Sequence, residues 1–586
     1  MRLNIVKSKN AKQFYVLKSY TNKNGIRTSK IVEKLGNETE VLKKSNGQDP
    51  IKWAIEYIAK LNEEEKLGIA PILIKKFPNK LIDKNSLKCF NGGYFFLQKI
   101  YYELGINNIC KEISNKYKFE FDLNNILSYL IYARIIFPSS KLSTYIRSKK
   151  FIEQPNFGLY QMYDALVIIS KEINFIQSEL YKNSLKLSKR NTGILYYDCT
   201  NYFFEIEEEE GLKKYGKSKE HRPNPIVQMG LFMDGDGIPL AFNITAGNTN
   251  EQITLTPLEE KILEDFKLSK FIVCTDAGLA STTNRKFNNK EDRAFITTQS
   301  IKKLKKFLKE WALATDDWHI NDPKDIKEKN KIYDVSKLEE TKTSEQEYKD
   351  RTFYKERWIK EDGLEQKLIV TYSIKYKNYQ RKIRNSQIEH AMKFIEDKPE
   401  KVDKCTENDF RRFIKKTNCT NEGEIAENKI YSIDTDIIAK EELFDGFYGV
   451  CTNLEDDAST IIEVNHRRWE IEESFRIMKS EFKARPVYLK RDDRITAHFT
   501  TCFISLMIHR FLEKRLEKNS FKEKFTSNEI IETLRDMWFT KEEEGYIPAY
   551  TRTDLTDVLH EKFNFRTDYE IVNMTTIKKI FKETKN

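Results

Sequence analysis

Hydrophobic and polar positions in the first 190 residues change from a strand-like to a helix-like period. In residues 1–45 they alternate through QFYVLKSY and TSKIVEKLG, on either side of the turn signal NKNG, which predicts a small β-hairpin unit. Asp49-Pro50 is a typical helix start, and IKWAIEYIAKLNEEE continues with helical spacing. Residues 46–190 are predicted to be mainly helical, through the segments YFFLQKIYYELG, LNNILSYLIYARIIF, YQMYDALVIIS and INFIQSELYKNSLKLS.

From residue 191 the pattern becomes strand-like. GILYYDCTNYFFEI (193–206) is rich in aromatic and β-branched residues, and two further strand-like runs flank DGDG at 234–237, a strong hairpin signal. A helix at ITLTPLEEKILEDF, a buried parallel strand at KFIVCTDAG and one more strand at RAFITTQS are expected to follow. This order is that of a ribonuclease H-like α/β core, with a mixed five-stranded sheet and flanking helices.

The core is predicted in two parts, 191–300 and 445–515. Between them, residues 301–444 are highly charged and less regular, with the strand-like segment QKLIVTYSIKY and helices around it, and we interpret them as a large insertion domain. DGFYGVCTN then returns to strand character, and a long helix is predicted at AHFTTCFISLMIHRFLEKRLEK. Residues 516–586 are predicted to form a C-terminal helical tail, a candidate dimerisation segment.

The stretch VNHRRWEIEESFRIMKSEF (464–482) carries its charges in a specific arrangement. On a helix with about 100° per residue, Lys479, Glu472 and Asn465 lie within about 60° of Arg468, and the apolar residues fill the adjoining arc. The charged group therefore borders the predicted buried face. Two interpretations remain open from this segment alone: an amphipathic surface helix with an Arg468–Glu472 ion pair, or a catalytic surface.

Composition narrows the classes of function only slightly. The chain of 586 residues has 101 lysines and arginines against 90 acidic residues, and this excess is compatible with a polyanionic partner without requiring one. The N-terminal MRLNIVKSKN does not resemble a signal peptide, and the apolar runs are short, so we expect a cytoplasmic protein. The eight cysteines form no CxxC pair and the seven histidines no HxH or HExxH pattern, which argues against a zinc enzyme.

Three segments together resemble the DDE transposases of bacterial insertion sequences. The resemblance is to the branch with a β-rich insertion before the catalytic Glu and the signature Y-x-x-R-x-x-x-E-x-x-x-x-x-x-K. YYDCTNYFFE and CTDAG match the segments that carry the family's two aspartates, here Asp198 and Asp276. Glu472 matches the catalytic Glu, and the flanking signature positions are occupied by Asn465, Arg468 and Lys479. Arg468, Glu472 and Lys479 match the family, whereas Asn465 stands where the family has tyrosine.

The resemblance implies a DNA-cutting site that uses divalent metal. Asp198, Asp276 and Glu472 are then the catalytic residues and the ligands of two Mg²⁺ ions, for which Mn²⁺ could substitute, with Asp198 bridging both. Water is expected to be the nucleophile for the first cut and a freed 3′-hydroxyl the nucleophile for strand transfer.

The same resemblance implies DNA contacts beside the metal. Arg468 and Lys479 are expected to contact phosphates, and Asn465, an amide where the family has a phenol, offers only hydrogen bonds to the DNA end. In the loop EEEEGLKKYGKSKEHR, either a solvated loop or a DNA contact is compatible with the sequence, and the resemblance favours DNA contact by Lys217, Lys219 and Arg222.

The predicted function is a transposase that cuts DNA at the inverted terminal repeats of its insertion sequence and joins it to target DNA. Its partners are double-stranded DNA and, because two ends are cut together, a second copy in a homodimer. The helical region 46–190 is either a DNA-end-binding region or an ordinary helical bundle. Trp311, Trp318 and Trp358 are candidates, by position only, to stack on a flipped base. The alternatives are a related nuclease without strand transfer and a catalytically silent DNA-binding repressor.

Overall fold

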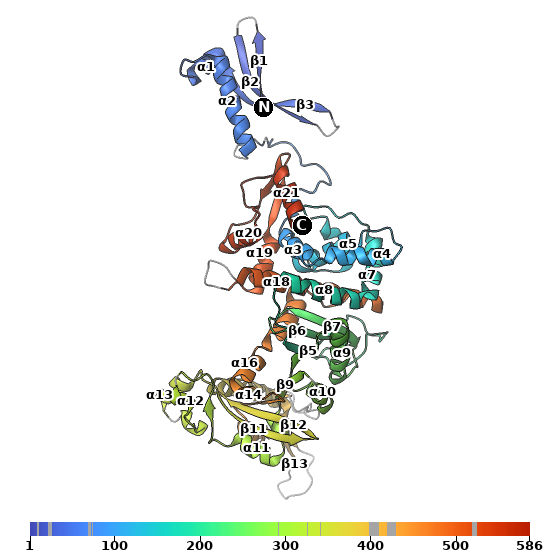
Figure 1. Cartoon of the computed structure of the whole chain (residues 1–586), viewed down its shortest axis with the longest axis vertical. Helices are drawn as coiled ribbons and strands as arrows, with labels where there is room; N and C mark the ends of the chain where they lie inside the picture. The colour runs from blue at the N-terminus through green and yellow to red at the C-terminus, as the bar shows by residue number, and fades with distance from the viewer. Residues whose placement is uncertain are drawn as a thin grey trace. The chain divides into compact units, whose positions relative to one another are not determined.

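The computed structural model describes residues 1–8, 11–21, 26–67, 72, 74, 76–290, 292–324, 326–339, 341–397, 409–418, 429–517 and 524–586. The chain divides into two compact units, which Figure 1 shows coloured from the N-terminus to the C-terminus. The first unit comprises Met1–Cys89 with the returning segments Thr540–Ile547 and Tyr569–Thr575. The second comprises Phe90–Phe539, Pro548–Asp568 and Thr576–Asn586.

The first unit contains an antiparallel sheet and two helices. Its elements are β1 (Arg2–Ser8), β2 (Ala11–Thr21), β3 (Arg27–Asn37), α1 (Glu38–Lys44) and α2 (Pro50–Leu67). As predicted, α2 begins at Pro50, and Asp49 caps it by accepting the backbone N–H groups of Ile51 and Lys52. Phe14, Val16 and Leu35 form its apolar core with residues of α1 and α2. The strands flanking the predicted hairpin are confirmed, and the turn NKNG itself lies outside the described residues.

The second unit begins with helices, as the hydrophobic periodicity predicts. They are α3 (Tyr94–Glu103), α4 (Ile106–Lys116), α5 (Leu123–Ile136), α6 (Lys141–Ser148), α7 (Leu159–Lys171) and α8 (Ile173–Leu187). α5 is buried on all sides, including Arg134, whose guanidinium donates to the backbone carbonyls of Phe482 and Ser139. Further elements along the chain are β4 (Cys89–Asn91), α19 (Ser527–Asp536), β16 (Trp538–Lys541), β17 (Gly545–Pro548), α20 (Asp554–Phe563), β18 (Val572–Asn573) and α21 (Met574–Thr584).

The long helix predicted after the core is α18 (Asp492–Glu517), which packs against α3, α5, α7 and β7 (Figure 1). In the described part of the chain it is the one helix long and apolar enough to cross a membrane, and 89% of its apolar window is buried inside the fold. Its hydroxyl groups at Thr500, Thr501 and Ser505 donate to backbone carbonyls four residues earlier, so burial leaves them hydrogen-bonded. These features are those of a core helix.

A mixed sheet forms the centre of the second unit, with strand order β10-β11-β12-β15-β9-β8-β5-β6-β7. The strands are β5 (Ile194–Phe203), β6 (Ile226–Asp234), β7 (Pro239–Ala246), β8 (Phe271–Thr275), β9 (Arg293–Gln299), β10 (His319–Ile320), β11 (Phe353–Glu361), β12 (Leu364–Tyr372) and β15 (Phe447–Thr452). β5, β6 and β7 form the predicted antiparallel meander, and β8 is parallel to both β5 and β9. Helices α9 (Leu255–Asp265) and α10 (Thr282–Phe287) connect β7, β8 and β9.

The predicted sheet of five strands is wrong in extent, because the sheet in the described residues has nine strands. β15 pairs with β9, and the hairpin β11–β12 pairs in turn with β15. An unpaired edge at β9 would expose a row of backbone donors and acceptors, and the added strands satisfy them. The insertion therefore extends the core sheet and does not stand apart from it.

The predicted β-rich character of the insertion is also wrong. Besides its strands, the segment contains α11 (Lys306–Leu313), α12 (Ile326–Lys329), α13 (Lys342–Tyr348), α14 (Ile374–Asp397) and α15 (Thr435–Glu442), and the pair β13 (Ile414–Asn418) and β14 (Lys429–Ile433). α14 has 24 residues, more than any strand of the insertion, and its sequence lacks glycine and proline. The strand predicted through QKLIVTYSIKY ends at Tyr372, since the Ser373 carbonyl accepts the Lys377 N–H and starts the helix.

The stretch predicted as one helix at 464–482 is interrupted. α16 (Ala458–His466) ends before Arg468, α17 (Trp469–Arg476) follows, and η6 (Ile477–Glu481) is a π-helical turn. In a continuous helix the Arg468 N–H would bond to the Val464 carbonyl, but the Tyr196 hydroxyl of β5 donates to that carbonyl. The Arg468 N–H bonds instead to the Asn465 carbonyl, which tightens the chain locally.

Candidate active site

Asp198 and Asp276 meet because their strands are parallel neighbours. β5 pairs with β8 in a register that places Tyr196 opposite Cys274, so each aspartate lies two residues beyond that pair, Asp198 within β5 and Asp276 just past the end of β8. The Cys199 N–H donates to Asp198 Oδ1 at 2.7 Å, and the Leu279 N–H donates to Asp276 Oδ1 at 3.1 Å. Among the described residues no hydrogen bond reaches the other oxygen, Oδ2, of either aspartate.

The charges around Asp198 define the electrostatics of the site. Burial raises the pKa of the Asp198 carboxyl to about 6, and the Asp276 carboxylate adds to the rise, whereas Lys219 and Arg468 oppose it. Lys219 donates to the Cys199 carbonyl and pairs with Glu251. Although burial lowers the pKa of Lys219, the charges of Asp198 and Glu251 outweigh it and hold the pKa above the ordinary value. The aspartates thus form a region of negative charge, which Lys219 and Arg468 neutralise only in part.

Arg468 connects the aspartates to Glu472. Arg468 Nη1 lies 3.6 Å from Glu472 Oε1, and its side chain is only 19% exposed. Burial lowers the pKa of Arg468, but Tyr448, Glu472 and Asp276 together raise it above the ordinary value. Its Nε is buried, with no hydrogen-bond partner among the described residues. One guanidinium therefore lies within electrostatic reach of all three carboxylates predicted from the sequence.

The three carboxylates are not gathered into one ligand set. Glu472 is 59% exposed and paired with Arg468, and no three His, Cys, Asp or Glu side chains of the described residues lie close enough to hold a metal ion. Asp198 and Asp276 by themselves fit a divalent cation, because they are adjacent hard oxygen donors whose mutual repulsion a cation would relieve. The structure brings Asp198 and Asp276 together. Glu472 is instead paired with Arg468, which lies within electrostatic reach of both aspartates.

The predicted DNA-contacting cations differ in the residues that they contact. Lys479 Nζ donates to Thr200 Oγ1 at 2.6 Å and lies 3.7 Å from Glu220 Oε1. Burial lowers the pKa of Lys479 to about 8, and the charge of Lys219 adds to this effect. Arg222 stacks on the Phe203 ring, with its guanidinium carbon 4.2 Å from the ring centroid.

The loop between β5 and β6 also positions Lys217. Its carbonyl accepts a hydrogen bond from the Asn201 side chain, and the Lys219 N–H donates to the same Asn201 side chain. Because Asn201 belongs to β5, it fixes the basic half of this loop beside the strand that carries Asp198.

The model of a family described as the transposase DDE domain matches residues 202–508, which is more than half of the chain. The chain belongs to the transposase DDE domain family. The matched stretch contains Asp276 and Glu472 and begins just after Asp198. No curated protein matches the sequence.

A solved structure, the piggyBac transposase synaptic complex with hairpin DNA determined by cryo-EM, is also similar to the chain. The similarity covers 83% of this chain and 84% of that chain, with 8% sequence identity and a TM-score of 0.36. This TM-score is too low to establish a common fold.

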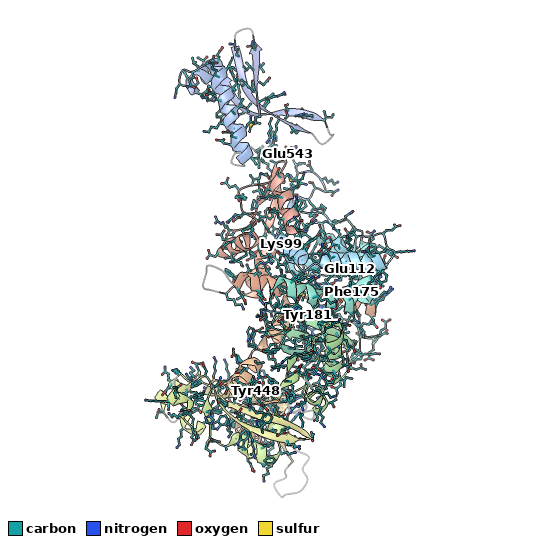
Figure 2. The ribbon with its side chains drawn as sticks, viewed as in Figure 1. Lys99, Glu112, Phe175, Tyr181, Tyr448 and Glu543 are labelled. Carbon is teal, nitrogen blue, oxygen red and sulfur yellow. The ribbon has the colours of Figure 1, made fainter. Side chains whose placement is uncertain are left out.

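Within the transposase DDE domain, Asn465 does not face solvent. It is buried, and its Nδ2 lies 3.5 Å from the hydroxyl of Tyr448, to which it donates. The same hydroxyl is 2.6 Å from Thr298 Oγ1 (Tyr448 is labelled in Figure 2). Tyr448 is also the strongest influence raising the pKa of Arg468, so β15 supplies a phenol within electrostatic reach of this arginine.

Sequence reasoning missed Tyr448. The segment DGFYGVCTN predicts the strand, but no spacing along the chain connects position 448 with Asn465 or Arg468. The connection comes from the pairing of β15 with β9, which sets Val450 opposite Thr298. One signal is visible in retrospect. The strand just before the signature segment contains a tyrosine, Tyr448, and the signature itself has Asn465 in place of its tyrosine.

The three tryptophans predicted as base-stacking candidates differ in environment. Trp318 is completely buried, and its Nε1 donates to the Ala314 carbonyl, so it is a core residue. Trp311 packs partly buried against the same core, under the ammonium of Lys355. Trp358 is exposed on β11 with Lys367 Nζ over its ring, and is the best placed of the three to stack on an external base.

Proposed function

We propose that the chain is a transposase that cuts DNA at the inverted terminal repeats of a bacterial insertion sequence and transfers the cut strand into target DNA. The observation that supports this proposal best is Arg468, a largely buried cation within electrostatic reach of Asp198, Asp276 and Glu472, in a chain of the transposase DDE domain family. Carboxylates can hold the metal ions of a phosphodiester-cutting site, and a guanidinium beside them can bind the phosphate.

The fold agrees with a ribonuclease H-like core. The strand order β7-β6-β5-β8-β9, with an antiparallel meander followed by two parallel strands, supports this assignment. In such a core, Asp198 and Asp276 belong to adjacent central strands, and α17 brings Glu472 from the second part of the chain.

Asp198 and Asp276 are proposed to hold divalent metal, with Glu472 completing the ligand set. Mg²⁺, when bound, supplies Lewis-acid stabilisation of the phosphate and activation of the oxygen nucleophile. For Glu472 to take part, its ion pair with Arg468 must be exchanged, and DNA provides the replacement partner, since guanidinium binds phosphate well.

The cations then have distinct tasks. Arg468 binds and orients the phosphate next to the carboxylates, through the guanidinium end that now pairs with Glu472. Lys479, held by Thr200, and Lys219, held by the Cys199 carbonyl, place positive charge on either side of Asp198. Lys217 and Arg222 extend the contact along the DNA, and Asn465 acts through Tyr448.

Joining of DNA strands distinguishes this function from its alternatives. We expect the purified protein, given Mg²⁺, a precleaved end of its element and supercoiled target DNA, to yield joined products on gels. Cleavage of uncut ends without joining would replace the proposal with a nuclease, and binding without either reaction would replace it with a repressor. Because two ends are joined together, the active complex should contain two copies of the chain, and its place of action is the bacterial cytoplasm.

A further inference from the structure

A pocket of about 650 Å³ lies apart from the three carboxylates, between the start of α6 and the segment after η6. Its polar lining is basic: Arg134, Lys141, Lys483 and Arg485. Among the described residues, those that line it include no aspartate or glutamate. His498 also lines it, and burial lowers its pKa well below the ordinary value, so it stays neutral. The pocket therefore selects for negative charge.

Lys141 is a buried cation of this pocket whose charge is unpaired among the described residues. The residue is 4% exposed, and no hydrogen-bond partner reaches its Nζ among the described residues. Burial lowers the pKa of Lys141 to about 7, and the neighbouring charge of Arg134 adds to this effect. An unpaired buried ammonium is destabilising, and its presence next to an open pocket calls for an anion that arrives from outside.

Two other cations of the pocket, Arg134 and Arg485, already have partners. Arg134 donates to the carbonyls of Phe482 and Ser139, so it fixes both walls. Arg485 pairs with Glu220 at the rim. Lys141 is also the first residue of α6, capped by Ser140, and the positive end of that helix adds to the attraction for an anion.

The pocket is connected to the active site through a chain of charged contacts. Arg485 pairs with Glu220, Glu220 lies 3.7 Å from Lys479, and Lys479 is hydrogen-bonded to Thr200. Thr200 and Asp198 are on the same face of β5, about 7 Å apart along the strand. A DNA strand that leaves the carboxylates along these residues would pass the pocket.

We propose that this pocket binds a backbone phosphate of the DNA beyond the cleavage point, with Lys141 as its counter-ion. The inference rests on the proposed function, because DNA is the source of that phosphate. Inorganic phosphate shares the same chemistry and serves as the first probe.

The first arm of the test measures thermal unfolding of the full chain with increasing inorganic phosphate at constant ionic strength. Phosphate should raise the midpoint of the native protein and of Lys150→Met, an exposed control just after α6, but not of Lys141→Met. Without phosphate, Lys141→Met should be at least as stable as the native protein. A less stable variant that still responds to phosphate would overturn the proposal. If Lys141→Met fails to fold, Lys483→Met at the exposed rim must weaken the response, and an unchanged response contradicts the site.

The second arm measures binding to duplex DNA over a range of salt. Lys141→Met should bind about tenfold more weakly, and its slope of log affinity against log salt should fall by about one. If Lys141→Met loses the response to phosphate but binds DNA as tightly as the native protein, the pocket binds free phosphate and the DNA assignment is wrong. If the native protein responds to phosphate but binds no DNA, the proposed function fails while the anion site stands.

Discussion

At the scale of single residues, the site is organised around Arg468. The charge of Arg468 lowers the pKa of Asp198, and the charges of Asp276 and Glu472 raise the pKa of Arg468. The two aspartates could be singled out from the sequence, Asp198 within the first strand-like segment of the core and Asp276 at the end of the fourth. Their common surroundings could not, because the neighbours of a side chain depend on strand register and on loops such as the one that brings Lys219 beside Asp198.

Tyr448→Phe should lower the rate of DNA-end cleavage about tenfold. The substitution keeps the ring but removes the hydroxyl that accepts from Asn465, whose carbonyl accepts the Arg468 N–H, so the turn that positions Arg468 loses a hydrogen bond. Single-turnover cleavage assays with a labelled DNA end measure the effect.

The matched control for this prediction is Thr298→Val. It removes the hydrogen bond between Thr298 and Tyr448 but leaves the phenol in place. If both substitutions slow cleavage equally, Tyr448 acts only as a structural residue, and its assignment to the active site is wrong.

At the scale of elements, the segment 464–482 shows what periodicity can and cannot predict. The apolar positions Ile471, Phe475 and Met478 are buried as the wheel requires. The break before α17 could not be predicted, because it depends on the Tyr196 hydroxyl from a strand far away in sequence. Likewise the strand β12 was predicted too long, since the change to α14 occurs inside one continuous apolar segment.

The packing of α9 against the turn after α10 predicts a pH-dependent stability. Glu259 of α9 is completely buried, Asn288 donates to both its carboxylate oxygens, and burial raises the pKa of Glu259 to about 8. The folded state therefore binds a proton that the unfolded state releases at lower pH. Stability should decline as pH rises from about 4.5 to about 8, by up to about 1.4 kcal/mol per pH unit.

Glu259→Gln should remove this part of the decline. Its amide can accept from Asn288 Nδ2 and donate to Asn288 Oδ1, which has no hydrogen-bond partner among the described residues. Urea unfolding at several pH values compares the two proteins. Parallel pH profiles for Glu259→Gln and the native protein would show that Glu259 does not titrate in this range.

At the scale of the whole molecule, the order of helices and strands along the chain could be predicted well from hydrophobic periodicity. The meander, the parallel strand and the hairpin at Asp234 all form where expected. The extent of the sheet could not be predicted, because β15 pairs with β9 across the whole insertion and β12, a strand of the insertion, pairs with β15. Glu472 shows the same limit, since its distance from the aspartates is determined by tertiary packing.

Binding of DNA by the whole chain should depend steeply on salt. The excess of basic residues and the cations around Asp198 suit six to ten phosphate contacts, which would lower affinity about 10³- to 10⁵-fold between about 50 and 200 mM salt. Equilibrium titrations at several salt concentrations measure this slope. An affinity that does not change with salt would argue against every phosphate contact assigned here.

The most direct test of the central claim is Mg²⁺-dependent cleavage of a terminal-repeat DNA by Asp198→Asn, Asp276→Asn and Glu472→Gln. Glu463→Gln, an exposed position on the preceding α16, is the control. If the three carboxylates act as one unit, each substitution should slow single-turnover cleavage at least about a thousandfold, and combining two should slow it little further, while the control cleaves normally. Cleavage by Glu472→Gln at the native rate would contradict the account. Glu472 is the sharpest test of the three, because it lies outside the pair of aspartates in the folded chain.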